Sequence, residues 1–287
     1  SIDKAPNLTD GDKQSVKDKA KTVADSAKTA ISNAKTVTDV ESAKNTGVEN
    51  IKNMPIPTAS KTKNDANSAL DTTADAAKKA IDKTSGLTAD QKQAAKDQID
   101  QAVTAAKDNI NKASDDTGVA AATDAGKLAI DKVSANAAID GALAEKNNSI
   151  DKAPNLTDGD KQSVKDKAKT VADSAKTAIS NAKTVTDVES AKNTGVENIK
   201  NMPIPTASKT KNDANSALDT TADAAKKAID KTSGLTADQK QAAKDQIDQA
   251  VTAAKDNINK ASDDTGVAAA TDAGKLAIDK VSANAAI

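Results

Sequence analysis

The sequence contains no histidine, cysteine, tryptophan, tyrosine or phenylalanine, and all 41 of its basic residues are lysine. Without imidazole or thiol groups, the chain lacks the usual general base at neutral pH and the usual ligands of zinc. Without aromatic rings or arginine, it lacks side chains that stack on bases or bind phosphate and carboxylate in a bidentate manner. We therefore predict that the chain is not an enzyme, binds no cofactor, and has no catalytic, cofactor-binding or metal-binding residues.

The balance of charge excludes further classes of partner. The 41 basic and 42 acidic residues give a formal net charge of -1, whereas a nucleic-acid-binding domain presents a basic face. No apolar run approaches the ~20 residues that cross a bilayer, so we expect no membrane insertion by this segment. The absence of cysteine fits both a reducing cytosol and a Gram-positive cell surface.

Two levels of repetition organise the chain. Residues 149–287 repeat residues 1–139 without a substitution, at an offset of 148. A second, diverged repeat at an offset of 79 aligns Leu8 with Leu87 and Ile51 with Ile130. These offsets predict four domains, alternately long and short, of which the last is truncated in its third helix: 1–80, 81–149, 150–228 and 229–287.

Each domain is predicted to contain three helices. Apolar residues recur every three or four positions over residues 10–35, 38–54 and 58–81 of the long form, and over 95–113, 117–133 and 135–150 of the short form. Strand signals are nearly absent. We predict an all-α fold of tandem three-helix bundles. Because an odd number of helices places the chain ends at opposite poles of a bundle, we expect the bundles to be strung end to end as an elongated rod.

The segment Ile-Asp-Lys, followed three residues later by Leu-Thr, occurs four times and is predicted to join one bundle to the next. Its first two occurrences are Ile2–Thr9 and Ile81–Thr88. Asn7 and Gly86 stand where a helix commonly ends with a left-handed residue. We expect these segments to stop the last helix of one bundle and start the first helix of the next.

Local chemistry predicts how the helices begin and where they approach closely. Thr9 and Thr88 are expected N-caps, with Asp12 and Gln91 three residues later as in a capping box. The cluster of Asn7, Asp10 and Asp12 resembles the start of a calcium loop but lacks its glycine, so we assign it to helix capping. Gly47 and Gly126 fall inside helices at matched positions, which favours a close helix crossing, because glycine there costs about 1 kcal/mol.

A recurring set of helical residues carries a resemblance to a known family. These residues are Ala80-Ile81-Asp82, Leu87-Thr88, Lys92-Gln93-Ala94-Ala95-Lys96, Ile99-Asp100-Gln101-Ala102, Ala106-Lys107-Asp108-Asn109-Ile110, Gly126 and Ile130. Over essentially its whole length, the chain resembles the helical repeats of about 70–80 residues in giant Gram-positive cell-wall proteins, such as the staphylococcal Ebh-type extracellular-matrix-binding proteins. The expected partners are neighbouring repeats of the same chain and, as a second candidate, a host extracellular protein. The resemblance implies three-helix modules in a long extracellular stalk, which displays an adhesive domain from a wall-anchored end. Some related modules bind albumin, immunoglobulin or fibronectin, but no residue here matches a binding motif.

These observations predict a non-enzymatic stalk or spacer segment of a bacterial cell-surface adhesin. The sequence begins and ends within the repeat pattern, so we expect the anchor to the cell wall to lie in parts outside this segment. One alternative is a three-helix module that binds albumin, immunoglobulin, fibronectin or fibrinogen. A further alternative is a disordered desiccation-protective protein, which would share the bias to alanine, lysine, aspartate and threonine. The predicted caps and helix stops favour a folded chain over the last alternative.

Overall fold

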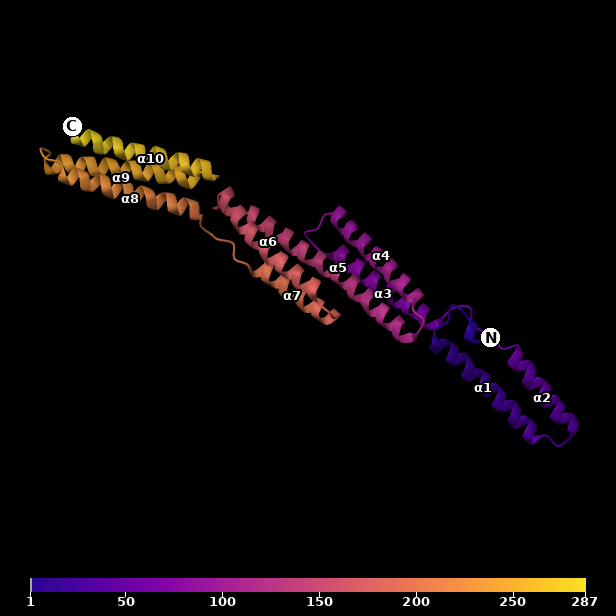
Figure 1. The fold of residues 1–287 in the computed structure, drawn as a ribbon. Helices are drawn as coiled ribbons and strands as arrows, with labels where there is room; N and C mark the ends of the chain where they lie inside the picture. Colours follow the sequence, from indigo (N-terminus) through magenta and orange to yellow (C-terminus); the bar gives the residue numbers. More distant parts are fainter. Residues whose placement is uncertain (1) are drawn as a thin grey trace. The chain divides into compact units, whose positions relative to one another are not determined.

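The computed structural model describes residues 2–287, and within that range every regular element is helical (Figure 1). This result confirms the all-α prediction. A short 3-10 helix, η1 (Ile2–Lys4), precedes the α-helices. These are α1 (Asp10–Asn33), α2 (Val37–Lys52), α3 (Lys61–Lys83), α4 (Ala89–Lys112), α5 (Asp116–Asp151), α6 (Asp158–Asn181), α7 (Val185–Asn201), α8 (Lys209–Lys231), α9 (Ala237–Lys260) and α10 (Asp264–Ala286).

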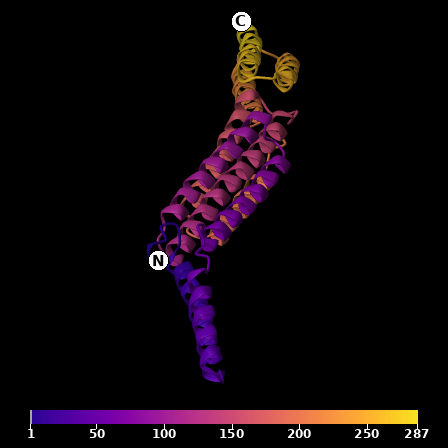
Figure 2. The ribbon, with the colours of Figure 1, turned by 90° about the vertical axis from the view of Figure 1, so that its right-hand side faces the viewer.

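The chain divides into two compact units. Unit 1 comprises the residues up to Gly141 together with Ala175–Thr194, and unit 2 comprises Ala142–Ser174 together with Gly195–Ile287. The bounds of α5, α6 and α7 place part of each helix in both units. Within each unit, neighbouring helices run alongside one another rather than crossing steeply (Figure 2).

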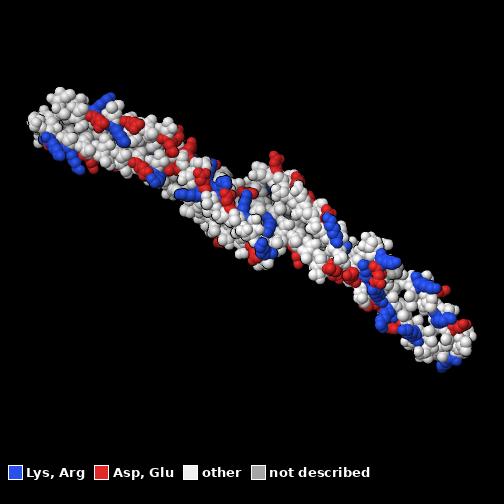
Figure 3. All heavy atoms as spheres, viewed as in Figure 1, with Lys and Arg blue, Asp and Glu red and all other residues white. Residues whose placement is uncertain are grey.

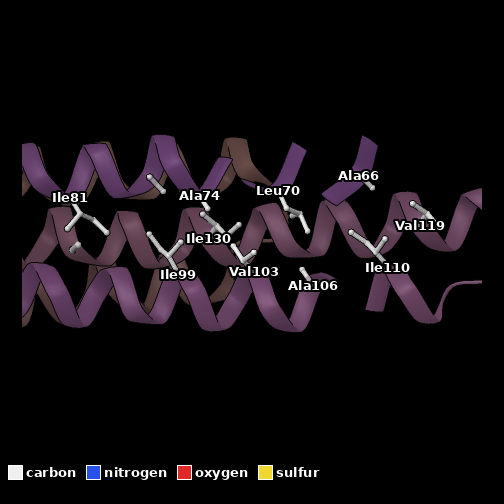
Figure 4. Close-up of a cluster of buried hydrophobic side chains, with 12 residues drawn as sticks. Ala66, Leu70, Ala74, Ile81, Ile99, Val103, Ala106, Ile110, Val119 and Ile130 are labelled. Atoms are coloured by element: carbon white, nitrogen blue, oxygen red, sulfur yellow. The ribbon is translucent and has the colours of Figure 1, made fainter. Parts of the chain in front are cut away.

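The main core of unit 1 lies between α3, α4 and the first part of α5. Figure 4 shows its side chains meeting between the three helices, with Ile81 of α3 beside Ile99 of α4. The β-branched and leucine side chains are almost completely buried, and alanines fill the spaces between them, which allows the helices to approach closely. The buried members are Ala66, Leu70, Ala74, Ala77, Ile81, Ile99, Val103, Ala106, Ile110, Val119, Ile130 and Ala137.

Unit 2 contains the corresponding core between α8, α9 and α10. Because residues 209–286 repeat residues 61–138, ten of the twelve buried side chains recur at an offset of 148, and the counterparts of Ala66 and Ala137 are partly buried. Its members are Leu218, Ala222, Ala225, Ile229, Ile247, Val251, Ala254, Ile258, Val267 and Ile278.

These cores require a correction to the predicted domain divisions. The expected boundaries at 80/81 and 228/229 fall inside the two cores. The segment Ile81–Thr88 therefore lies within one bundle, where it forms the end of α3 and the turn to α4. The turn is closed by Lys96 Nζ, 2.8 Å from Asp82 Oδ1, and by Lys92 Nζ, which donates to Asp82 O at 2.7 Å. A short connection favours antiparallel packing of the helices that it joins. The proline-containing segment 53–60 is the longer connection, and it separates α2 from α3.

A second correction concerns α5. The pattern predicts two helices, 117–133 and 135–150, whereas the structure has one helix of 36 residues, Asp116–Asp151. Neither proline nor a capping sequence interrupts the chain near residue 134, and its alanine-rich neighbours are good helix formers. Gly141 within this helix allows the α3–α4 turn to approach, since a Cβ atom there would lie 2.6 Å from Ser85 O.

Most of the local predictions are confirmed. Thr9 and Thr88 cap α1 and α4, and each forms a capping box with the residue three positions later. Gly86 has φ +82°, as expected of a left-handed stop. A Cβ atom at Gly126 would lie 2.5 Å from Ala106 Cβ and 2.8 Å from Leu70 Cδ2, which confirms a close helix crossing.

Two local predictions are wrong. No non-glycine residue among the described residues has a positive φ, so Asn7 is not a left-handed stop. The Asn7 side-chain amide instead donates to Thr58 O at 3.5 Å. Pro6, directly before it, prevents η1 from continuing as a helix. The second predicted helix, 38–54, begins one residue earlier, at Val37, because Thr36 is its N-cap and the Thr36 hydroxyl accepts from Asp39 N at 3.2 Å.

Candidate functional surface

Clusters of acidic side chains are the first candidates for a metal site in this chain. No group of three or more histidine, cysteine, aspartate or glutamate side chains is placed to hold a metal ion in residues 2–287. Asp10 and Asp12, considered above for calcium, lie in the first turn of α1, where carboxylates stabilise a helix N-terminus. In the same residues, no helix combines the length and apolar character needed to span a membrane. The candidate functional features are the polar and apolar clusters on the surfaces of the helices.

A polar cluster joins the N-termini of α1 and α3. Asp12 Oδ2 accepts hydrogen bonds from Thr9 N at 3.2 Å, from Thr9 Oγ1 at 2.9 Å, and from Ser60 Oγ. Ser60 is itself the N-cap of α3, and its hydroxyl accepts from Lys63 N at 3.1 Å. We call Thr9, Asp12 and Ser60 the capping cluster. Thr157, Asp160 and Ser208 repeat it in unit 2.

The sequence predicted two of the three residues of the capping cluster. Thr9 and Asp12 follow a local pattern, but Ser60 lies 48 positions from Asp12 and reaches it only after folding. The available signal was the serine directly before the periodic part of α3, because serine is a preferred N-cap. The predicted start near Thr58 missed it by two residues.

The capping cluster stabilises the charged form of its carboxylate. Partial burial favours the neutral acid, but hydrogen bonds from Ser60 and Thr9 outweigh it and hold the pKa of Asp12 below its usual value of 3.8. The pKa of Asp160 is lowered for the same reasons, with Ser208 and Thr157 as donors. A carboxyl group whose pKa is lowered by folding stabilises the folded state above its unfolded pKa.

We predict that replacing both carboxylates, Asp12→Asn with Asp160→Asn, lowers the melting temperature at pH 7 and has a smaller effect at pH 3. The stabilisation from these groups is present above pH 3.8 and is lost as the pH falls through their lower folded-state pKa. Circular dichroism melts at both pH values measure the difference. The matched control is Asp108→Asn with Asp256→Asn at exposed helix positions. An equal loss at pH 7 and pH 3 would contradict the assignment.

Charges of both signs are interspersed on the face seen in Figure 3. Some ion pairs bridge helices, such as Lys107–Asp71 at 2.7 Å and Lys78–Asp100 at 2.5 Å. Others lie within one helix, such as Lys21–Asp25 at 2.5 Å, whose hydrogen bond raises the pKa of Lys21 and lowers that of Asp25. Exposed pairs of this kind add little to stability individually. Their effect is a polar, mixed-charge surface.

The α1–α2 pair differs from this polar surface because it exposes large apolar side chains. Val40 and Ile51 are 38% and 39% exposed, whereas the identical Val188 and Ile199 of the α6–α7 pair are 2% and 0% exposed. The two pairs have the same sequence, so the difference comes from what covers them. The second half of α5 lies against α6 and α7, and no corresponding helix lies against α1 and α2 in the described residues.

Comparison with a family model supports the same grouping of helices. The family, described as "Domain of Unknown Function (DUF1542)", matches residues 1–59, 62–136, 131–207 and 210–286. The second and fourth matches coincide with the cores of α3–α4–α5 and α8–α9–α10. The second and third overlap within α5, and the first covers only α1 and α2 among the α-helices. We propose these ranges as the structural repeats in place of 1–80, 81–149, 150–228 and 229–287.

Curated relatives include very long proteins of Staphylococcus aureus. The "Extracellular matrix-binding protein EbhA" of strain Newman is 31% identical over 271 residues, which is 90% of this chain but 8% of that protein. The "Extracellular matrix-binding protein ebh" of strain NCTC 8325 / PS 47 is also 31% identical over 271 residues, which cover 3% of its length. No solved structure matches the chain significantly. These similarities confirm the resemblance to Ebh-type repeats, and the four family matches show that the chain belongs to the DUF1542 family.

Proposed function

We propose that the chain is a non-enzymatic stalk or spacer segment of a bacterial cell-surface adhesin, which holds an adhesive domain away from the cell wall. The observation that carries this proposal is the tandem repetition of one small helical unit, matched four times by a single family model. The exact copy of residues 1–139 in residues 149–287 adds length without adding a new kind of surface. Similarity over 90% of the chain to much longer extracellular matrix-binding proteins supports the extracellular location.

The mechanism of such a segment is geometric. Each helix of 23 or 24 residues is about 35 Å long at 1.5 Å per residue, so each added bundle can extend the array by a similar distance. The interspersed lysine and aspartate side chains keep the surface of the array hydrated. The number of repeats then sets the distance that the array spans.

Small-angle X-ray scattering of arrays with one, two and four copies of the 148-residue unit tests the spacer role. For an extended array, we expect the radius of gyration to nearly double with each doubling of copy number. A compact arrangement would increase it only about 1.3-fold, because the radius of a globular protein grows as about the 0.38 power of length. That compact scaling would overturn the proposal.

The alternative is a module that itself binds a host protein, and this alternative is favoured by the relatives, which are named extracellular matrix-binding proteins. Surface plasmon resonance with immobilised albumin, immunoglobulin, fibronectin and fibrinogen separates the two functions. A spacer gives no saturable response at micromolar concentrations. Saturable sub-micromolar binding by one 148-residue unit, blocked by substitutions on a single helix face, would replace the spacer role with a binding role.

A further inference from the structure

The open apolar face of the α1–α2 pair can be defined residue by residue, because the chain carries an identical pair in which that face is covered. Seven side chains of α1 and α2 are exposed or half-exposed, while their counterparts in the α6–α7 region are buried. We call these seven residues the open face. They are Ala20, Ala24, Ala27, Ile31, Ala34, Val40 and Ile51, and their buried counterparts are Ala168, Ala172, Ala175, Ile179, Ala182, Val188 and Ile199.

The covering element of the α6–α7 pair is the second half of α5, residues 131–151. In unit 1, Lys132 Nζ donates to Ser180 O at 2.7 Å, and Asp140 forms an ion pair with Lys176. The groups that would bind the same helix are present on α1, since the Ser32 carbonyl and the Lys28 side chain are the counterparts of those of Ser180 and Lys176.

Unit 2 shows the same kind of anchoring for the end of the covering helix. Lys146 Nζ donates to Lys200 O at 2.8 Å and to Met202 O at 2.7 Å. Near the last turn of α5, Asp151 lies 2.6 Å from Lys165. On the α1–α2 pair, these three partners correspond to Lys52, Met54 and Lys17.

The short helix η1 lies on α1 at the position that the end of α5 occupies on α6. Its sequence, Ile2–Lys4, is the same as Ile150–Lys152, which contains the last turn of α5 and the residue after it. Asp3 lies 2.6 Å from Lys17, and the equivalent pair in unit 2, Asp151 and Lys165, has the same 2.6 Å separation. η1 therefore makes the same ion pair with α1 that the end of α5 makes with α6.

We propose that the open face is a docking site for one helix with the sequence of residues 131–149, supplied by a second copy of the repeat unit, with its C-terminal end meeting η1. This occupant is favoured because the same surface buries the same residues against that sequence elsewhere in the chain. It would also bring Asp140 to Lys28, Lys132 to the carbonyl group of Ser32, and Lys146 to the carbonyl groups of Lys52 and Met54, as in the covered pair. The site joins copies of the unit through a shared helix, and it does not depend on the proposed spacer role.

The direct test adds a synthetic peptide of residues 129–149, labelled at its N-terminus, to the full chain. We expect saturable binding, measured by fluorescence anisotropy, with a gain in peptide helicity. Hydrogen exchange should slow at least about tenfold in α1 and α2 and remain unchanged in α8–α10, which serve as the internal reference. Because most helical stability in proteins comes from tertiary packing, a gain in the helicity of the peptide on mixing reports docking.

Matched substitutions on both partners test the face. Ile51→Asp in the chain and Ile139→Asp in the peptide place a charge in the contact, and each should weaken binding at least about tenfold. The controls, Asn45→Asp in the chain and Asn148→Asp in the peptide, alter residues that are exposed both in the covered pair and on α5. Hydrogen exchange of the Ile51→Asp chain without peptide establishes that α1 and α2 are still folded.

A charge exchange tests the direction and register. The peptide with Asp140→Lys should bind the native chain more weakly and should regain affinity for the chain with Lys28→Asp. Binding that is indifferent to Ile51→Asp and Ile139→Asp, or that is not rescued by the exchange, would overturn the proposed occupant. A chain that sediments as a dimer, with α1 and α2 already protected and no response to peptide, would assign the face to self-association instead and would also overturn it.

Discussion

Replacing Ser134 by proline is expected to destabilise the folded chain by about 3 kcal/mol or more. The substitution falls between 117–133 and 135–150, where the sequence pattern alone predicts a gap between two helices. In the structure, residue 134 lies in the interior of α5, so proline would remove a helical hydrogen bond and clash with the carbonyl of Ile130. Ile130 and Ala137 belong to the buried core with α3 and α4, so we expect faster hydrogen exchange in those helices as well as in α5.

The identical residue Ser282 provides the control for this prediction. It has the same preceding sequence, but α10 ends at Ala286, so proline there disturbs only the last turn. We expect Ser282→Pro to lower the melting temperature much less than Ser134→Pro and to leave exchange in α8 and α9 nearly unchanged. Equal, small effects of both substitutions would show that α5 is interrupted at residue 134 in solution.

The features that the sequence predicted well are those decided by neighbouring residues. The capping boxes of Thr9 and Thr88 require only a hydroxyl group and a partner three positions later. The stop at Gly86 depends on the ease with which glycine adopts a positive φ. Gly126 was recognised because a glycine inside a helix costs stability unless close packing requires it. The helical class follows from the same local preferences together with the spacing of apolar residues.

The grouping of helices into cores could not be deduced in the same way. A repeat period defines the length of the unit but not the residue at which the unit begins. The stripe of α3 could pack against α2 or against α4, and both arrangements bury the same side chains, such as Leu70 and Ile81. The structure chooses α4, through the tight turn at Gly86, whereas the segment containing Pro55 and Pro57 separates α3 from α2. The residues of the two connecting segments therefore determine which helices pack together, and the repeat period alone does not.

The open face was also beyond prediction from local sequence. Ile51 and Ile199 have identical neighbours in the chain, yet one is 39% exposed and the other is fully buried. The difference lies in α5, whose second half covers α7 but not α2. Similarly, Ser60 became part of the capping cluster only through contact with Asp12, far away in the sequence. In both cases the deciding partner is distant in sequence and close in space.

Truncation of one core leucine distinguishes the two groupings of helices. Leu70 is fully buried and contacts α4 and α5 residues in the core of unit 1. Leu70→Ala removes buried methyl groups and leaves a cavity, so we expect a loss of about 2–5 kcal/mol in local stability. Hydrogen exchange should accelerate in α3, α4 and the first half of α5, and α1 and α2 should be unaffected. A domain of residues 1–80 predicts the opposite, namely faster exchange in α1 and α2 with α4 unchanged.

The matched variant Leu218→Ala tests the same grouping in unit 2. Leu218 is also fully buried, and the core around it involves α8, α9 and α10 alone. We expect its truncation to accelerate exchange throughout these three helices and to leave α3 and α4 unchanged. The control for both variants is Gln101→Ala with Gln249→Ala, at exposed positions of α4 and α9. If Leu218→Ala instead accelerated hydrogen exchange in α6 and α7 while exchange in α9 and α10 stayed slow, the helices would be grouped as in the predicted domain 150–228. The three-helix cores described above would then be wrong.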